Sequence, residues 1–379
     1  MSSRALKLLE SIRGWPGASP GIPAALMTTP ATDQRLRILV VKLTSMGDTL
    51  HVLPALSDLV ENSPQVKIDW MIEDSFSDIP RLHPGVNRVI PVSTRRWRSL
   101  NLRNLKELYR FIKLLRAEPY DVVIDAQGLM KSAALSCLAK LKRNGKRIGL
   151  SADSIKERPA ARFYHHDIDI PKNQHAIDRL RQLFAYGFNY PVPTTKPNYS
   201  INALKPSTQR ADKQELPTIF FFPSTTWASK HIPDSIWRAL SDLVLEQGYQ
   251  IKISWGSADE KIRAEKIADQ RSAIQVLPKL ALSELASQLS NASGAIAVDT
   301  GLGHLAAGLG IATVSVYGAT DATLTGAIGD SSNLLQTDYP CSPCFLKQCD
   351  KLTQTQTTPP CYATITAESI WTSLSEQII

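Results

Sequence analysis

Two successive series of short apolar runs alternate with segments of helical periodicity, and this alternation constrains the fold most. The first series covers 37–42, 67–72, 88–92, 121–124 and 147–150, with helices expected over 49–61 and 100–117. The second covers 218–222, 250–255, 274–277, 295–298 and 313–317, with helices expected over 234–246 and 283–289. Uniformly apolar runs separated by helices are typical of parallel strands buried on both faces. We therefore predict an α/β protein with two Rossmann-like doubly wound domains facing a central cleft.

The distribution of prolines and polar residues predicts the domain boundaries. Glycines and prolines interrupt residues 14–23, and a second polar, proline-containing stretch covers 191–217. We expect an N-terminal extension over 1–36, a first domain over 37–205 and a second domain over 206–362. A cysteine-rich segment, 341–361, closes the second domain, and a C-terminal helix is expected within 363–379. A chain of 379 residues is long enough for two full cores.

Charge is divided unequally between the two halves. Residues 37–205 carry a net charge of +11 and residues 206–379 a net charge of −5. A basic half attracts polyanions such as nucleic acid, an anionic membrane surface or phosphorylated glycolipids, although a merely solvated basic surface is the alternative. No apolar run reaches the length of a membrane span, and charged residues interrupt the first 13 residues. We therefore expect a cytoplasmic protein.

The first segment with chemical potential is KLTSMGDTLH, directly after the first expected strand. Gly47 permits a tight turn there. Asp48 then lies near the start of a helix, at the carboxyl end of the sheet, where a carboxylate can serve as a general base. The alternative is that Asp48 merely caps the helix. Because GxGxxG is absent, we expect no dinucleotide cofactor.

Two loops of the second half suit a nucleotide. Thr225, Thr226 and Lys230 follow the strand at 218–222, and hydroxyls together with a lysine can bind phosphate. An ordinary polar loop is the alternative. Glu260 follows the strand at 250–255, where a carboxylate can bind ribose hydroxyls or can simply stabilise a helix start.

A third loop of the second half contains the sequence VDTGLGHLAA. Asp299 can accept hydrogen bonds from sugar hydroxyls. Thr300 and Gly301 open a small-residue helix whose first backbone N–H groups can bind a diphosphate. His304 lies one turn farther along that helix. An aspartic protease would need an all-β context, so we reject that interpretation of DTG.

Basic residues of the first half form a candidate site for an anionic acceptor. Arg95, Arg96 and Arg98 lie in the sequence TRRWR. Gln127 and Lys131 follow another expected strand, in DAQGLMKS. Further cations on the helix at 100–117 are Arg103, Lys106, Arg110, Lys113 and Arg116. Phosphates would pair with such side chains, but a solvated helix face accounts for many of them equally well.

Four cysteines crowd into the end of the second half. Cys341, Cys344, Cys349 and Cys361 have the spacing C-x2-C-x4-C-x11-C, which suits zinc or iron, and a loop of free thiols fits equally well. Stable disulfides do not suit a reducing cytoplasm.

Five of these segments, in this order and spacing, resemble the lipopolysaccharide core heptosyltransferases of glycosyltransferase family 9. They are KLTSMGDTLHVLPAL, VIDAQGLMKSAAL, TTWASKHIPDSIW, WGSADE and VDTGLGHLAA, and the resemblance runs from about residue 36 to about residue 325. It is greatest to the heptosyltransferase I branch. The resemblance implies a GT-B fold. It also implies an inverting transfer of L-glycero-D-manno-heptose from ADP-heptose, bound by the C-terminal domain, to the Kdo of Kdo2-lipid A, bound by the N-terminal domain.

The resemblance also implies roles for individual residues. Asp48 matches the catalytic base. The donor-binding positions are Thr225, Thr226, Lys230, Glu260, Asp299, Thr300, Gly301 and His304. We expect no required metal or other cofactor, no nucleic-acid partner, and a peripheral location at the inner face of the inner membrane. The extension before residue 36 and the cysteine-rich segment depart from the family pattern.

Two alternatives stay open. One is another enzyme of the same family, heptosyltransferase II or a protein heptosyltransferase. The other is a non-enzymatic polyanion-binding protein, against which stands the absence of any helix-turn-helix or RNA-recognition signature.

Overall fold

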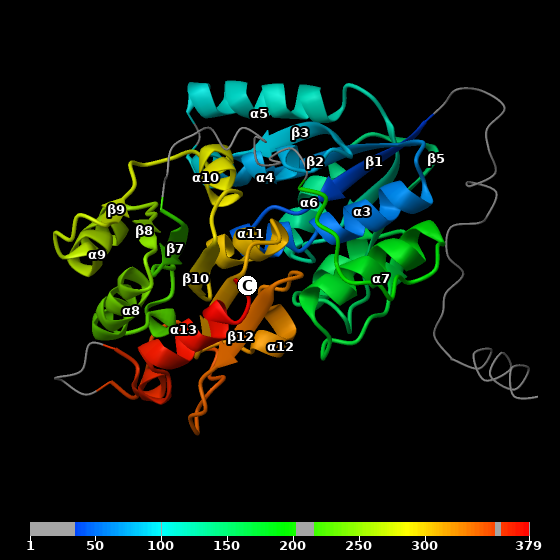
Figure 1. Cartoon of the computed structure of the whole chain (residues 1–379). Helices are drawn as coiled ribbons and strands as arrows, with labels where there is room; N and C mark the ends of the chain where they lie inside the picture. Colours follow the sequence, from blue (N-terminus) through cyan, green and yellow to red (C-terminus); the bar gives the residue numbers. More distant parts are fainter. Residues whose placement is uncertain (1–34, 100, 202–215, 353–357, 379) are drawn as a thin grey trace, which may run out of the picture.

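Two parallel six-stranded sheets form the framework of the computed structural model, which describes residues 35–99, 101–201, 216–352 and 358–378 (Figure 1). The first sheet has the order β3-β2-β1-β4-β5-β6. Its strands are β1 (Leu36–Val41), β2 (Val66–Glu73), β3 (Val86–Val92), β4 (Tyr120–Asp125), β5 (Leu141–Leu150) and β6 (His166–Ile168). Every neighbouring pair is parallel; β1, for example, aligns Leu39 with Asp69 of β2 and with Val123 of β4.

The second sheet has the order β12-β11-β10-β7-β8-β9 and is again parallel throughout. Its strands are β7 (Thr218–Phe222), β8 (Gln250–Ile253), β9 (Ile274–Val276), β10 (Gly294–Val298), β11 (Thr313–Tyr317) and β12 (Ser332–Gln336). The predicted pair of doubly wound sheets is therefore confirmed. Strands β6 and β12 were not predicted, because β6 has only three residues and the sequence of β12, SNLLQ, carries too few apolar residues to reveal it.

Helices cover the sheets and make the contact between the two halves. The described α-helices after β1 are α2 (Met46–Leu50), α3 (Leu53–Asn62), α4 (Asp78–Arg81), α5 (Leu102–Leu115), α6 (Met130–Cys137), α7 (Ala176–Phe188), α8 (Asp234–Glu246), α9 (Ala258–Ala268), α10 (Leu282–Leu289), α11 (Gly301–Gly308), α12 (Ala322–Thr325) and α13 (Ala367–Ser375). Three pairs join the halves: α2 with α11, α4 with α10, and α7 with α12.

The helix predicted over 49–61 is two helices, α2 and α3. Pro54 lies in the first turn of α3, where a residue without an N–H is tolerated and a helix begins readily. The break after Leu50 lets α2 turn toward the second half while α3 packs on α7. The predicted terminal helix is confirmed as α13, which packs on α8 and on strands β10, β11 and β12 (Figure 1).

The apolar core is continuous across the two halves. Alternate residues of β7 face opposite sides: Phe221 packs with Trp237 of α8, whereas Phe220 and Phe222 join a cluster that also contains Ile38 of β1. This shared burial stabilises the two domains in contact with each other.

The predicted extension 1–36 lies almost wholly outside the described residues, as does most of the predicted linker. The described part of that linker, 191–201, has no helix or strand. Its Tyr199 is buried, and the hydroxyl donates a 2.6 Å hydrogen bond to the backbone oxygen of Ile328. Among the helices that the structure describes, none is long and apolar enough to cross a membrane.

Candidate functional site

The site lies where the loop after β1 meets the loop after β10. Both are at the carboxyl ends of central strands, the usual ligand-binding edge of a doubly wound sheet. Helices α2 and α11 approach each other so closely that glycine is required on both. A Cβ atom added to Gly47 would lie 2.8 Å from the ring of His304, and one added to Gly301 would lie 2.5 Å from the side chain of Met46. Asp48 is thereby held against the start of α11.

Asp48 is half-buried, and its carboxylate is fixed by the residue that begins its helix. Oδ2 accepts hydrogen bonds from the backbone N–H of Ser45 at 3.0 Å and from the Ser45 hydroxyl at 2.7 Å. Ser45 is the N-cap and Asp48, three positions later, completes a capping box with it, so the helix-cap alternative for Asp48 is met in this form. Burial alone would raise the pKa of Asp48, but the charge of Lys42 and the Ser45 hydrogen bonds outweigh it and lower the pKa.

Lys42 is a functional candidate that the sequence did not single out. It ends the first strand segment, is buried, and donates a 3.1 Å hydrogen bond from Nζ to the backbone oxygen of Ala126. Burial lowers the pKa of Lys42, while the carboxylates of Asp48 and Asp125 act in the opposite direction. A lysine at the end of an otherwise apolar buried strand was the available signal, because such a charge is rarely buried without a partner.

Gln127 supports the Asp48 loop in this structure. Its Oε1 accepts hydrogen bonds from the backbone N–H groups of Leu43 at 3.0 Å and Thr44 at 3.1 Å. These contacts fix the chain just before α2. The predicted role of Gln127 in binding an acceptor stays a prediction.

Two of the predicted donor-binding residues, Lys230 and Asp299, lie together in the second half, and their role in binding the donor stays a prediction. Nζ of Lys230 lies 2.6 Å from Oδ2 of Asp299 and 4.5 Å from the centre of the Trp227 ring. The hydroxyl of Thr320 also donates to Asp299. Thr225 lies on the same loop as Lys230, and Nε2 of His231 is 2.9 Å from its backbone oxygen. Lysine and carboxylate thus form a mostly buried ion pair at the mouth of the β10–α11 loop.

Three histidines meet at the contact between the two halves. Nδ1 of His304 lies 3.1 Å from Nε2 of His51, and the rings of His51 and His175 are 5.6 Å apart. Nε2 of His175 lies 3.1 Å from the backbone oxygen of Gly326. Burial lowers the pKa of His304 to about 4 and also lowers the pKa values of His51 and His175. All three rings are therefore neutral near pH 7. Sequence spacing did not identify His51 or His175 as candidate site residues.

Thr300 and Glu260 have structural positions at helix starts. Thr300 is the N-cap residue of α11. Oε2 of Glu260 accepts hydrogen bonds from the backbone N–H of Gly256 at 2.6 Å and of Ser257 at 3.3 Å, which completes a capping box on α9. The helix-start alternative for Glu260 is thus met by the geometry, and its contact with a nucleoside stays a prediction. Thr226 is exposed on the loop before Lys230.

The basic residues predicted to bind an acceptor lie on neighbouring surface segments. Arg95 and Arg98 are exposed, whereas Arg96 is held by Glu107 at 2.6 Å and Asp74 at 3.3 Å. Lys131, at the start of α6, donates a 3.1 Å hydrogen bond from Nζ to the hydroxyl of Thr94. Lys131 therefore lies next to the arginine segment, and the role of these residues in binding an acceptor stays a prediction.

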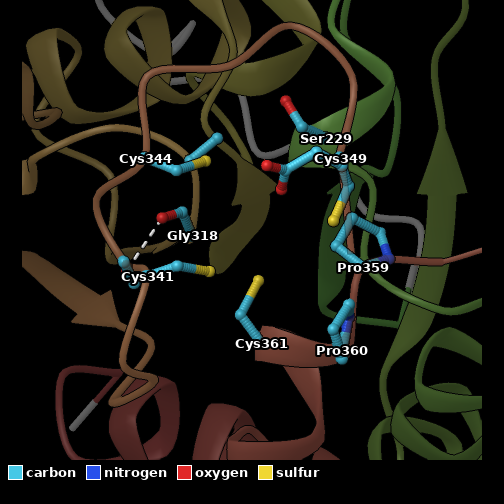
Figure 2. Close-up of a pocket in the computed structure, with 11 residues that line it drawn as sticks. Ser229, Gly318, Cys341, Cys344, Cys349, Pro359, Pro360 and Cys361 are labelled. Carbon is cyan, nitrogen blue, oxygen red and sulfur yellow. Dashed lines mark hydrogen bonds between the residues drawn. The ribbon is translucent and has the colours of Figure 1, made fainter. Parts of the chain in front are cut away.

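The four C-terminal cysteines surround one small cavity of about 10 Å³, between the loop after β11 and the segment before α13. Figure 2 shows the side chains of Cys341, Cys344, Cys349 and Cys361 around this space. All four are free thiols, and burial raises the pKa of Cys361 to about 11. Within the described residues, no group of three or more His, Cys, Asp or Glu side chains could hold a metal ion. The spacing therefore predicts the gathering of the cysteines correctly but not a formed metal site.

Comparison with known proteins shows the family to which this chain is similar. A model of glycosyltransferase family 9 (heptosyltransferase) matches residues 108–354. Lipopolysaccharide heptosyltransferase 1 of Pseudomonas aeruginosa is 42% identical over 319 residues, which cover 83% of this chain and 87% of that protein. Lipopolysaccharide heptosyltransferase 1 of Escherichia coli K12 is 41% identical over 298 residues, covering 78% and 91% respectively.

Solved structures agree with the sequence comparisons. The E. coli heptosyltransferase WaaC with ADP superposes with a TM-score of 0.79 at 36% identity and covers 90% of this chain and all of that one. E. coli ADP-heptose lps heptosyltransferase II shares the fold, with a TM-score of 0.70 at 19% identity over 90% of this chain and 98% of that one. With matches of this extent in both sequence and structure, the chain belongs to glycosyltransferase family 9, the heptosyltransferases.

Proposed function

We propose that this protein transfers L-glycero-D-manno-heptose from ADP-heptose to the Kdo of Kdo2-lipid A, with inversion at the anomeric carbon and with Asp48 as the general base. The relatives at about 40% identity are named lipopolysaccharide heptosyltransferase 1, and WaaC structures contain ADP or ADP-2-deoxy-2-fluoro heptose. The structures with bound nucleotide support ADP-heptose as the donor. The names of the relatives support the acceptor of heptosyltransferase I over that of heptosyltransferase II.

The observation that carries the proposal is the contact between α2 and α11. The Gly47–His304 and Gly301–Met46 contacts bring the only acid of α2, Asp48, next to the first backbone N–H groups of α11. A helix start binds anions, so a diphosphate there would present its sugar toward Asp48. Donor and base thus come from different domains and meet only when the domains are in contact.

Each step of the transfer has a residue suited to it. Asp48 takes the proton of the acceptor hydroxyl as that oxygen bonds to the anomeric carbon, while the bond from that carbon to the phosphate oxygen breaks and ADP leaves with the electron pair. A lowered pKa keeps Asp48 ionised and ready to accept the proton. Lys230 and the amides of α11 stabilise the charge that develops on ADP. In this role Lys230 shares its charge between Asp299 and the diphosphate.

The test is release of ADP from ADP-heptose in the presence of Kdo2-lipid A. Replacing the base, Asp48→Asn, should lower kcat by about a hundredfold to ten-thousandfold, the usual contribution of a general base, while donor binding measured by calorimetry persists. The matched control is Asp330→Asn, because Asp330 is an exposed acid of the second half. Near-parental turnover by Asp48→Asn would refute the assignment of the base.

A second comparison separates this function from the other members of the family. The protein should consume ADP-heptose with Kdo2-lipid A and not with an acceptor that already carries the first heptose. The opposite preference would assign it to heptosyltransferase II, and transfer to a polypeptide alone would assign it to the protein heptosyltransferases.

A further inference from the structure

Helix α5 lies on the outer side of the first domain, over β3, where it forms one border of the molecule (Figure 1). Its inner face is fixed by Phe111 and Leu115, which are buried against the first sheet. The helix is therefore firmly placed, and its other face is directed away from the protein.

That outer face carries large apolar side chains. Leu102 is 87% exposed, Leu105 48% and Tyr109 67%. The spacings of three and four residues place all three on one side of the helix. A cluster of exposed apolar side chains on one helix face indicates a surface that contacts a membrane or another molecule.

Cations flank this apolar stripe. They are Arg103, Lys106, Arg110, Lys113 and Arg116, all exposed. None of them forms an ion pair with another residue that the structure describes, and the only acid of the helix, Glu107, is paired with Arg96. The outer face of α5 thus combines apolar side chains with uncompensated positive charge.

We propose that α5 lies flat in the surface of an anionic lipid bilayer, with Leu102, Leu105 and Tyr109 among the lipid headgroups. The flanking cations would then pair with lipid phosphates, and their long side chains can reach outward from a buried stem. Nucleic acid is the less suitable polyanion, because phosphates attract the cations but give no reason for exposed leucines. The inference rests on the proposed function in one respect: the exposed Arg95 and Arg98 directly precede α5, so a lipid-borne acceptor would reach the site from the same surface.

Sedimentation with vesicles tests the inference without donor or acceptor. The parent protein should bind vesicles of phosphatidylethanolamine and phosphatidylglycerol, less so at high salt, and should not bind phosphatidylcholine alone. The triple variant Leu102→Gln, Leu105→Gln and Tyr109→Gln keeps helix-compatible residues and should bind about tenfold more weakly, since it removes apolar area from the lipid contact. The matched control is Ile262→Gln on α9, which removes a 51% exposed apolar side chain from the second domain and should change nothing.

The inference and the proposed function fail in distinguishable ways. If the triple variant has an unchanged unfolding temperature and still binds vesicles like the parent, membrane docking by α5 is wrong. Membrane docking by α5 is also wrong if a duplex oligonucleotide displaces the vesicles from the parent protein and binds the triple variant as tightly as it binds the parent. Heptose transfer to Kdo2-lipid A dispersed in detergent should be equal for the parent and the triple variant. If neither transfers heptose there, the function fails while the docking surface stands.

Discussion

Replacing Lys42 by methionine should shift the pH dependence of transfer. Lys42 is the largest contribution that lowers the pKa of Asp48, and it acts from a buried position. A nearby opposite charge favours the ionised form of a carboxyl and so lowers its pKa. Methionine keeps the length of the side chain but removes the charge, so burial would dominate and the pKa of Asp48 would rise.

The sign of the expected shift follows from the role of the base. Asp48 works only when ionised, so activity is lost as the pH falls through its pKa. In the parent that loss occurs below the ordinary range of an aspartate, because the pKa is lowered. In Lys42→Met the acid limb of kcat/KM, which reports the free enzyme, should move toward neutral pH. Initial rates of ADP release across the acidic range measure this shift.

Lys42→Arg is the matched control, because it restores the charge at the same position. Its acid limb should lie close to that of the parent even if the rate at the plateau is lower. If the acid limb of Lys42→Met stays in place or moves to lower pH, then either Asp48 is not the base or Lys42 does not set its pKa. A circular-dichroism melt shows whether each variant is folded at the assay temperature.

Three further outcomes follow from the contacts described above. Gly301→Ala places a methyl group 2.6 Å from Cβ of Met46, so kcat/KM should fall by about tenfold or more, and Met46→Gly in the same chain should restore part of it, whereas Met46→Ala, which keeps that Cβ, should not. Arg181→Ala leaves Asp58 buried without the cation whose Nε and Nη2 lie 2.7 Å and 3.0 Å from its oxygens, and urea unfolding should show a loss of about 3–5 kcal/mol. Burial lowers the pKa of His304 from 6.5 to about 4, so the unfolded chain binds the proton more strongly than the folded chain does. As the pH falls from 6.5 to 4, the free energy of unfolding should therefore fall by about 3 kcal/mol, and the decrease should be smaller in His304→Gln.

The sequence predicted the architecture well, because buried parallel strands and amphipathic helices are local patterns. It also placed Asp48, Lys230 and Asp299 correctly at strand ends, since the carboxyl edge of a parallel sheet is a general ligand-binding position. The ion pair between Lys230 and Asp299 joins two loops whose proximity follows from the adjacent strands β7 and β10. Spacing along the chain was sufficient for these residues.

Other features depend on contacts that no local pattern encodes. His51 and His304 are 253 residues apart, and they meet only because the two domains are in contact. The importance of Lys42 became visible only with its burial and its hydrogen bond to Ala126. The break between α2 and α3 was missed because the apolar pattern continues through Pro54, which lies where a helix tolerates it.

The two glycines at the contact between α2 and α11 restrict which amino-acid substitutions the two domains can accept. Gly47 is matched to the ring of His304, and Gly301 to the side chain of Met46. A larger residue at either glycine is accommodated only if its partner in the other domain becomes smaller. A library that randomises one domain alone should therefore return glycine at the position that it covers, whereas a library that randomises a glycine together with its partner in the other domain should recover new combinations. Exchange of whole domains between relatives would succeed only where the two parents carry compatible residues at both pairs.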